Sequence, residues 1–165
     1  SQANASGQKP PYVCGHYPPH LTFLIGKGEE LPFPEKTFDV IVSKYALQVS
    51  TNIPKILEEV ARVLKPEGYF VFLTKHPLRQ FLEKINTYKD EGSINYFEQK
   101  IVDSLIYEKK IHLREPSHTL SEYFSKEVLK NFDMIDFLED SDFPASEQIN
   151  NYVYPTFFVA KFRRR

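Results

Sequence analysis

The sequence predicts an α/β fold with a mostly parallel sheet, and three consecutive segments carry the prediction. Residues 38–43 are β-branched and apolar on almost all positions of both faces, which is typical of a parallel strand covered by helices. From Ile53 to Leu64 the apolar residues recur at helical spacing, with Thr51 or Asn52 in place to cap the helix. Residues 69–74 form another apolar strand. Strand, helix and strand with short joints predict a right-handed parallel crossover unit.

The N-terminal part is expected to contribute little regular structure. Residues 1–20 contain two proline pairs with glycines between them, which favours turns and extended chain. Residues 21–25 (Leu-Thr-Phe-Leu-Ile) are predicted to be a short buried strand. We therefore expect an irregular segment over 1–20 and one α/β domain over 21–165.

The second half of the chain has a less regular pattern of apolar residues. Apolar residues between 78 and 85 predict an amphipathic helix, whereas residues 87–117 are polar with scattered aromatics and no firm period. The aromatics suit either a lid over an apolar substrate or the core of an inserted helical segment, so 78–117 is treated as an inserted, lid-like segment. Further on, Thr119 and Glu122 form a capping-box pattern that opens a helix. Residues 132–138 and 156–162 are predicted to be the last two strands.

Composition excludes several classes of function. A net charge of −1 gives no basic surface for nucleic acid, and no apolar run is long enough to span a membrane. Cys14 is the only cysteine, which excludes an intrachain disulfide and favours the cytoplasm. Cys14, His16 and His20 lack an evident fourth ligand, so no metal site is expected. The partner predicted on these grounds is a small molecule.

Two segments read together resemble the middle of a class I S-adenosylmethionine-dependent methyltransferase of the type 11 domain family. They are residues 26–43 (Gly-Lys-Gly-Glu-Glu-Leu-Pro-Phe-Pro-Glu-Lys-Thr-Phe-Asp-Val-Ile-Val-Ser) and 53–68, which ends Val-Leu-Lys-Pro-Glu-Gly. The resemblance covers roughly residues 21–85 and 117–162. It implies a Rossmann-like methyltransferase fold, truncated at its N-terminus, with an antiparallel C-terminal strand.

The sequence departs from this family at two places. Residues 1–20 supply no glycine-rich turn of the kind that holds the cofactor, because Gly7 and Gly15 are far apart and no strand precedes them. Lys27 stands where the family has an aspartate, and lysine can only donate a hydrogen bond. The resemblance also implies an uncovered apolar sheet edge, which another chain in a homo- or hetero-oligomer would cover.

The resemblance assigns roles to particular residues. The cofactor, S-adenosyl-L-methionine, would contact Lys27, Gly28, Glu29, Glu30, Leu31, Ser43 and Tyr45. Gln48 and His118 would contact the substrate. His76 either acts as a general base or only begins a turn before Pro77.

The function implied is methyl transfer from S-adenosyl-L-methionine to a small-molecule acceptor, by this chain or by an enzyme of which it forms the C-terminal part. The alternative is a non-catalytic methyltransferase-like module, a binding or scaffold subunit that has lost the cofactor loop. The missing glycine-rich turn and Lys27 favour this alternative, whereas the motifs in 26–43 and 53–68 favour the enzyme.

Overall fold

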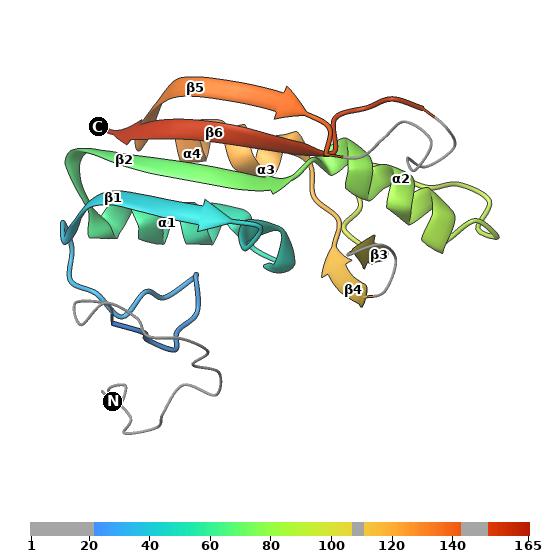
Figure 1. Ribbon diagram of the computed structural model, residues 1–165, viewed down its shortest axis with the longest axis horizontal. Coiled ribbons are helices and arrows are strands. Elements are labelled where there is room, and N and C mark those ends of the chain that lie inside the picture. The colour runs from blue at the N-terminus through green and yellow to red at the C-terminus, as the bar shows by residue number, and fades with distance from the viewer. Residues whose placement is uncertain (1–21, 107–110, 143–151) are drawn as a thin grey trace.

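The computed structural model describes residues 22–106, 111–142 and 152–165 (Figure 1). Its elements in chain order are β1 (Phe38–Lys44), a 3₁₀ helix (Leu47–Val49), α1 (Ile53–Val63), β2 (Leu64–Lys75), α2 (Pro77–Thr87), β3 (Ile101–Ile106), β4 (Ile111–Pro116), α3 (Leu120–Phe124), α4 (Lys126–Leu129), β5 (Phe132–Asp140) and β6 (Phe157–Arg164). The expected irregular segment, residues 1–20, lies outside the described residues.

The main sheet has four strands in the order β1-β2-β6-β5. β1 and β2 are parallel, as the crossover unit requires, and α1 connects them. β6 is antiparallel to both β2 and β5, so only one of the three pairings is parallel. The α/β fold with an antiparallel C-terminal strand is confirmed, in a sheet that is mixed rather than mostly parallel.

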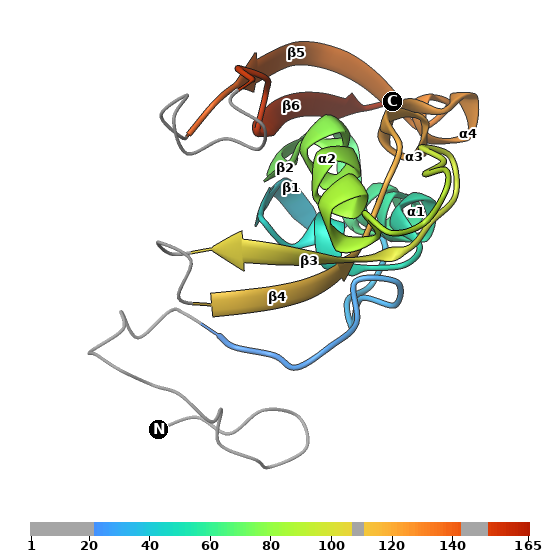
Figure 2. The ribbon, with the colours of Figure 1, turned by 90° about the vertical axis from the view of Figure 1, so that its right-hand side faces the viewer.

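One face of the sheet carries the core. α1, α3 and α4 pack on this face, and α2 continues beyond the end of the sheet next to the β3–β4 hairpin (Figures 1 and 2). Aromatic rings fill the space under the helices: the Phe72 ring lies 5.8 Å from Phe158 and 5.3 Å from Phe162. Such buried aromatic pairs add to the hydrophobic stabilisation of the domain.

The expected strand at residues 21–25 is wrong over the part that the structure describes. Residues 22–25 belong to no strand, and Phe23, Leu24 and Ile25 are exposed. An apolar run becomes a strand only where a neighbouring strand satisfies its backbone, and nearby the structure has only an isolated bridge between Lys27 and Glu30. Leu21 lies outside the described residues.

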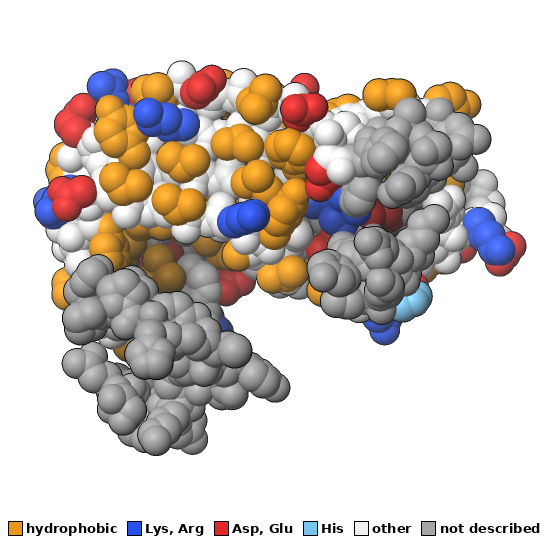
Figure 3. Space-filling view, viewed as in Figure 1, with side chains coloured by type: hydrophobic (Ala, Val, Ile, Leu, Met, Phe, Trp, Pro, Cys, Tyr) orange, Lys and Arg blue, Asp and Glu red, His pale blue; other side chains and the backbone are white. Residues whose placement is uncertain are grey.

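The expected burial of both faces of β1 is also wrong. Val40 is 55% exposed and Val42 is 70% exposed, whereas Ile41 and Ser43 point to the helix-covered side. β1 is at the edge of the sheet, and no described helix lies over its second face. Figure 3 shows hydrophobic side chains gathered across this uncovered face.

β2 begins earlier than predicted, at Leu64, directly after α1. Its pairing with β1 is interrupted between Leu64 and Tyr69 by a bulge. Gly68 permits this close turn, because a Cβ there would lie 2.9 Å from the Lys65 carbonyl oxygen and 3.0 Å from that of Asp39.

α2 is present as predicted, with its two faces reversed. Leu78 is exposed and Phe81 only partly buried, whereas Arg79, Gln80 and Glu83 are buried. The segment that follows forms the β3–β4 hairpin, not an inserted helical segment. Among its aromatics, Tyr88 donates to the Ile101 carbonyl at 2.8 Å and the Tyr96 hydroxyl accepts from the Leu120 amide at 3.0 Å, so both hold backbone in place.

Candidate functional site

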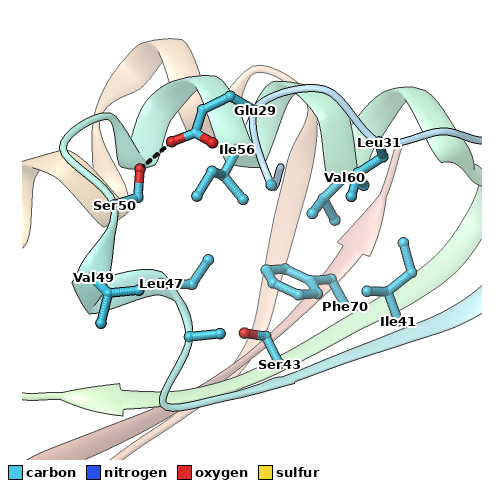
Figure 4. A pocket seen from close by; sticks show the side chains of 12 residues that line it. Glu29, Leu31, Ile41, Ser43, Leu47, Val49, Ser50, Ile56, Val60 and Phe70 are labelled. Atoms are coloured by element: carbon cyan, nitrogen blue, oxygen red, sulfur yellow. Dashed lines mark hydrogen bonds between the residues drawn. The ribbon is translucent and has the colours of Figure 1, made fainter. Parts of the chain in front are cut away.

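A cavity of about 410 Å³ lies between β1, α1 and the loop that precedes β1 (Figure 4). The carboxyl end of β1 opens into it, and at such an edge of an open α/β sheet ligands bind. Its lining residues are Gly28, Glu29, Leu31, Ile41, Ser43, Ala46, Leu47, Val49, Ser50, Ile56, Val60 and Phe70. The volume is within the range of about 300–1,000 Å³ typical of small-molecule sites.

The walls of this cavity are mainly apolar, and its polar groups come from Glu29, Ser43 and Ser50. The Ser50 hydroxyl donates to Glu29 Oε1 at 2.5 Å. This hydrogen bond lowers the pKa of the Glu29 carboxyl below its usual range, so the group is ionised near neutral pH. The cavity therefore combines apolar walls with one carboxylate in its lining.

Two residues of α1 fix the loop that forms one wall of the cavity. The Glu59 carboxylate accepts from the Leu31 amide at 3.0 Å, and Arg62 donates to the carbonyls of Leu31 and Phe33 at 3.0 and 2.8 Å. Arg62 also donates to Glu59 at 2.8 Å. Neither residue was assigned a role from the sequence, although their spacing of three positions on a helix is the available signal.

Four of the predicted cofactor contacts come together in this cavity: Gly28, Glu29, Leu31 and Ser43. Lys27 instead lines a neighbouring depression of about 240 Å³, bounded mainly by residues 22–33. Glu30 is exposed and lines neither space. Gly28 and Leu31 line both spaces, whereas Glu29 lines only the cavity and Lys27 only the depression.

Tyr45 follows β1 but turns away from the cavity. Its backbone has φ = 52°, in the left-handed region, and its hydroxyl donates to Asp142 Oδ2 at 3.2 Å. Burial, together with the Asp142 charge, raises the pKa of Tyr45 to about 12. Tyr45 therefore holds the start of the loop after β5 rather than a group in the cavity.

The two predicted substrate contacts, Gln48 and His118, lie against each other in the interior. His118 Nε2 donates to the Gln48 carbonyl oxygen at 3.1 Å, and His118 Nδ1 is 2.7 Å from Glu122. Burial raises the pKa of the Glu122 carboxyl, but the hydrogen bonds from His118 and Thr119 outweigh burial and lower this pKa overall. The Gln48 side chain accepts from Thr74, so both residues are engaged with protein groups.

His76 is the N-cap of α2. Its Nδ1 accepts from the Leu78 amide at 3.0 Å, and its Nε2 is 2.7 Å from Glu139 Oε1. Because a carboxylate accepts, Nε2 carries the proton and the ring is held as that tautomer. The contacts match the second of the two interpretations of this residue, a turn before proline.

Known proteins share the sequence and the fold of this chain in part. The sequence model of the methyltransferase-domain family matches residues 1–72. The solved structure of an S-adenosylmethionine-dependent methyltransferase from Mesorhizobium loti superposes with a TM-score of 0.59 at 18% identity, covering 84% of this chain and 68% of that protein. The chain has the class I methyltransferase fold. The resemblance to S-adenosylmethionine-dependent methyltransferases is confirmed, by sequence over residues 1–72 and by fold over most of the chain.

Relatives with curated descriptions match a smaller part of this methyltransferase-fold chain than the solved structure does. The demethylmenaquinone methyltransferase of Symbiobacterium thermophilum is 38% identical over 63 residues, 38% of this chain and 25% of that protein. The mitochondrial arginine-hydroxylase NDUFAF5 of Rattus norvegicus is 38% identical over 74 residues, 42% of this chain and 22% of that protein. The chain thus spans about a quarter of the curated relatives it matches, and their names include more than one activity.

Two further findings bear on the class of protein. Within residues 22–106, 111–142 and 152–165, no group of three or more His, Cys, Asp or Glu side chains has the arrangement of a metal site. Cys14, His16 and His20 lie outside these residues. Among the helices that the structure describes, none combines the length and apolarity needed to cross a membrane.

Proposed function

We propose that this chain takes part in methyl transfer from S-adenosyl-L-methionine to a small-molecule acceptor. One observation carries the proposal: Gly28, Glu29, Leu31 and Ser43, which the family places against its cofactor, line one cavity of about 410 Å³. Net charge of −1 argues for a small molecule as the acceptor rather than a nucleic acid.

The cavity residues suit this cofactor chemically. Apolar side chains such as Leu31, Ile56 and Val60 offer a surface for a planar base, and the ionised Glu29 can accept from hydroxyl or amino groups. When bound, S-adenosyl-L-methionine supplies an activated methyl group. The protein's contribution is then to hold the acceptor in line and exclude water.

Thermal unfolding with and without S-adenosylhomocysteine tests the proposal. Ligand at about 100 times its dissociation constant adds about 2.7 kcal/mol to the stability of the native state. For a domain of this size the melting temperature then rises by roughly 5–10 °C. A cooperative transition with no rise would contradict the proposal and favour a non-catalytic, methyltransferase-like module.

A glycine variant locates the binding in the cavity. A Cβ at Gly28 would lie 3.0 Å from Ile56 Cδ1, so the side chain of Gly28→Val displaces Ile56 and fills part of the cavity. We expect this variant to lose most of the ligand-induced rise. Gly92→Val is the matched control, because nothing lies within 4 Å of a Cβ at Gly92. An equal rise in both variants would place the ligand elsewhere.

A further inference from the structure

A cluster of charged and polar side chains is buried where β2 ends and α2 begins. α2 turns Arg79 and Glu83 inward, although its apolar residues were available for the interior. Burying an ionised group is unfavourable unless charged or polar partners compensate it, so the partners of Arg79 and Glu83 fix which side of α2 faces inward. The polar cluster consists of Lys75, Arg79, Glu83, Ser104 and Glu115.

The contacts in the polar cluster join three separate elements. Lys75, the last residue of β2, donates to Glu83 of α2 at 3.1 Å and is paired with Glu115 of β4. Ser104 of β3 donates to Glu83 Oε2 at 2.6 Å. Arg79 donates to Glu83 Oε1 at 3.1 Å and lies 3.8 Å from Asp142. The hairpin is thus joined to the sheet by charged groups.

The donors of the polar cluster do not satisfy all of its acceptors. Lys75, Ser104 and the Gln80 amide all approach Glu115 Oε1. Glu115 Oε2 is buried and has no hydrogen-bond partner, and the Glu115 side chain is 0% exposed. Leaving a buried acceptor without a donor is destabilising, and more so when the acceptor is charged.

The polar cluster lies next to the cavity described above. Lys75 stands at the carboxyl end of β2, the edge at which ligands of open α/β sheets bind. Gln48 connects the two places, since its side chain accepts from the Lys75 amide at 3.3 Å and the preceding Leu47 lines the cavity. Basic and acidic side chains are visible at this end of the sheet in Figure 3.

We infer that the polar cluster is a binding site for a small primary or secondary amine, held as its ammonium ion by Glu115. An ammonium group supplies the donor that Glu115 Oε2 lacks, and its charge makes the hydrogen bond to a carboxylate stronger than one from a neutral donor. The amine would be the methyl acceptor, an assignment that rests on the proposed function. It then gives one proton to Glu115, and its freed lone pair bonds the methyl carbon while the electron pair of the broken S–C bond stays on sulfur.

Movement of the hairpin away from β2 and α2 would open the polar cluster. Ser104 and Glu115 belong to β3 and β4, whereas Lys75, Arg79 and Glu83 belong to β2 and α2. Separating these elements exposes charged groups that water solvates well, so the opening costs less than parting an apolar interface of similar size. The hairpin therefore acts as a cover over the ammonium site.

Titration with ethanolamine, followed by NMR, tests this site. The reporters are the backbone amides of Ser104 and Glu115 and the side-chain amide of Gln80, with and without saturating S-adenosylhomocysteine. We expect ethanolamine to shift these signals and ethylene glycol, which is of similar size and uncharged, to leave them unchanged. In Glu115→Gln, which keeps the size of the side chain, ethanolamine should bind at least 10-fold more weakly.

The control variant is Asp103→Asn, which removes an exposed carboxylate from the same hairpin, 3.4 Å from Arg114, and should bind ethanolamine as the wild type does. Equal ethanolamine affinity in wild type and Glu115→Gln overturns the inference, as does an equal response to ethylene glycol. Should Glu115→Gln not fold, the two probes on the wild type decide. If the protein binds S-adenosylhomocysteine but not ethanolamine, only this inference is wrong. If it binds ethanolamine but not S-adenosylhomocysteine, the proposed function is wrong and the ammonium site stands.

Discussion

His76 shows how the contacts of one residue separate two interpretations of a histidine that follows a strand. A general base needs a free ring nitrogen that can reach the substrate proton. Both nitrogens of His76 are engaged within the protein, one by the Leu78 amide and one by Glu139. The ring also caps the N-terminus of α2, where the first backbone amides have no acceptor within the helix.

This geometry predicts different outcomes for two variants. His76→Ala removes the cap, and we expect it to lower the free energy of unfolding by about 1 kcal/mol. His76→Asn keeps a side-chain acceptor at the cap and should recover most of that loss, although it loses the contact with Glu139. Chemical denaturation of both variants provides the measurement. Equal losses would show that the Glu139 contact, and not the cap, is what stabilises the protein.

At the scale of residues, the sequence indicated some site members and not others. Gly28, Glu29, Leu31 and Ser43 were predicted because a short motif places them, and they do line one cavity. Glu115 was not predicted. Its distinguishing property is a buried oxygen without a donor, which depends on what Lys75 and Gln80, far away in sequence, bring to it. A local sequence pattern does not show how many donors distant residues bring to a buried carboxylate.

At the scale of elements, Glu59 and Arg62 join α1 to the loop that forms the cavity wall. The hydrogen bond from Arg62, with that from the Leu31 amide, lowers the pKa of Glu59 from 4.5 to about 2. The folded state thus holds the ionised form. Its contribution to stability is complete above pH 4.5 and is lost as the pH falls from 4.5 toward about 2.

Glu59→Gln should therefore destabilise the protein near neutral pH, by about 1–3 kcal/mol for hydrogen bonds to a charged group. The difference from the wild type should shrink as the pH falls through the range below 4.5. Denaturation curves at several pH values measure it. The control is Glu58→Gln, whose carboxylate is exposed and 3.6 Å from Lys55, and which should show little effect at any pH. A difference for Glu59→Gln that is constant with pH would contradict the assignment.

The elements themselves were mostly predictable, and the exceptions have a common cause. α1, α2, β5 and β6 all follow from periodicity and capping residues. The reversed faces of α2 do not, because periodicity identifies an apolar stripe without saying what the rest of the protein offers opposite each side. The strand expected at residues 21–25 fails over residues 22–25 for the same reason: this backbone has no neighbouring strand in the part of the chain that the structure describes.

At the scale of the whole molecule, the sheet has one covered and one uncovered face within the described residues. Val40, Val42, Tyr69 and Leu138 are exposed on strands of this sheet, and β1 has one unpaired edge. Apolar patches of this kind and free strand edges promote association. The sequence indicated such an edge, although it placed it on residues 21–25 rather than on β1.

We expect this face to drive association, and Val42→Lys to prevent it. Val42 is 70% exposed, so the substitution should change the stability of the folded chain by no more than about 0.5 kcal/mol. Light scattering after size exclusion, over a range of protein concentrations, should show oligomers for the wild type and a smaller mass for Val42→Lys. Val153→Lys, which removes a 75% exposed valine outside the sheet, is the control and should behave as the wild type does. A wild type that stays monomeric at every concentration, or an equal effect of the two lysines, would show that the uncovered face of β1 is not an association surface.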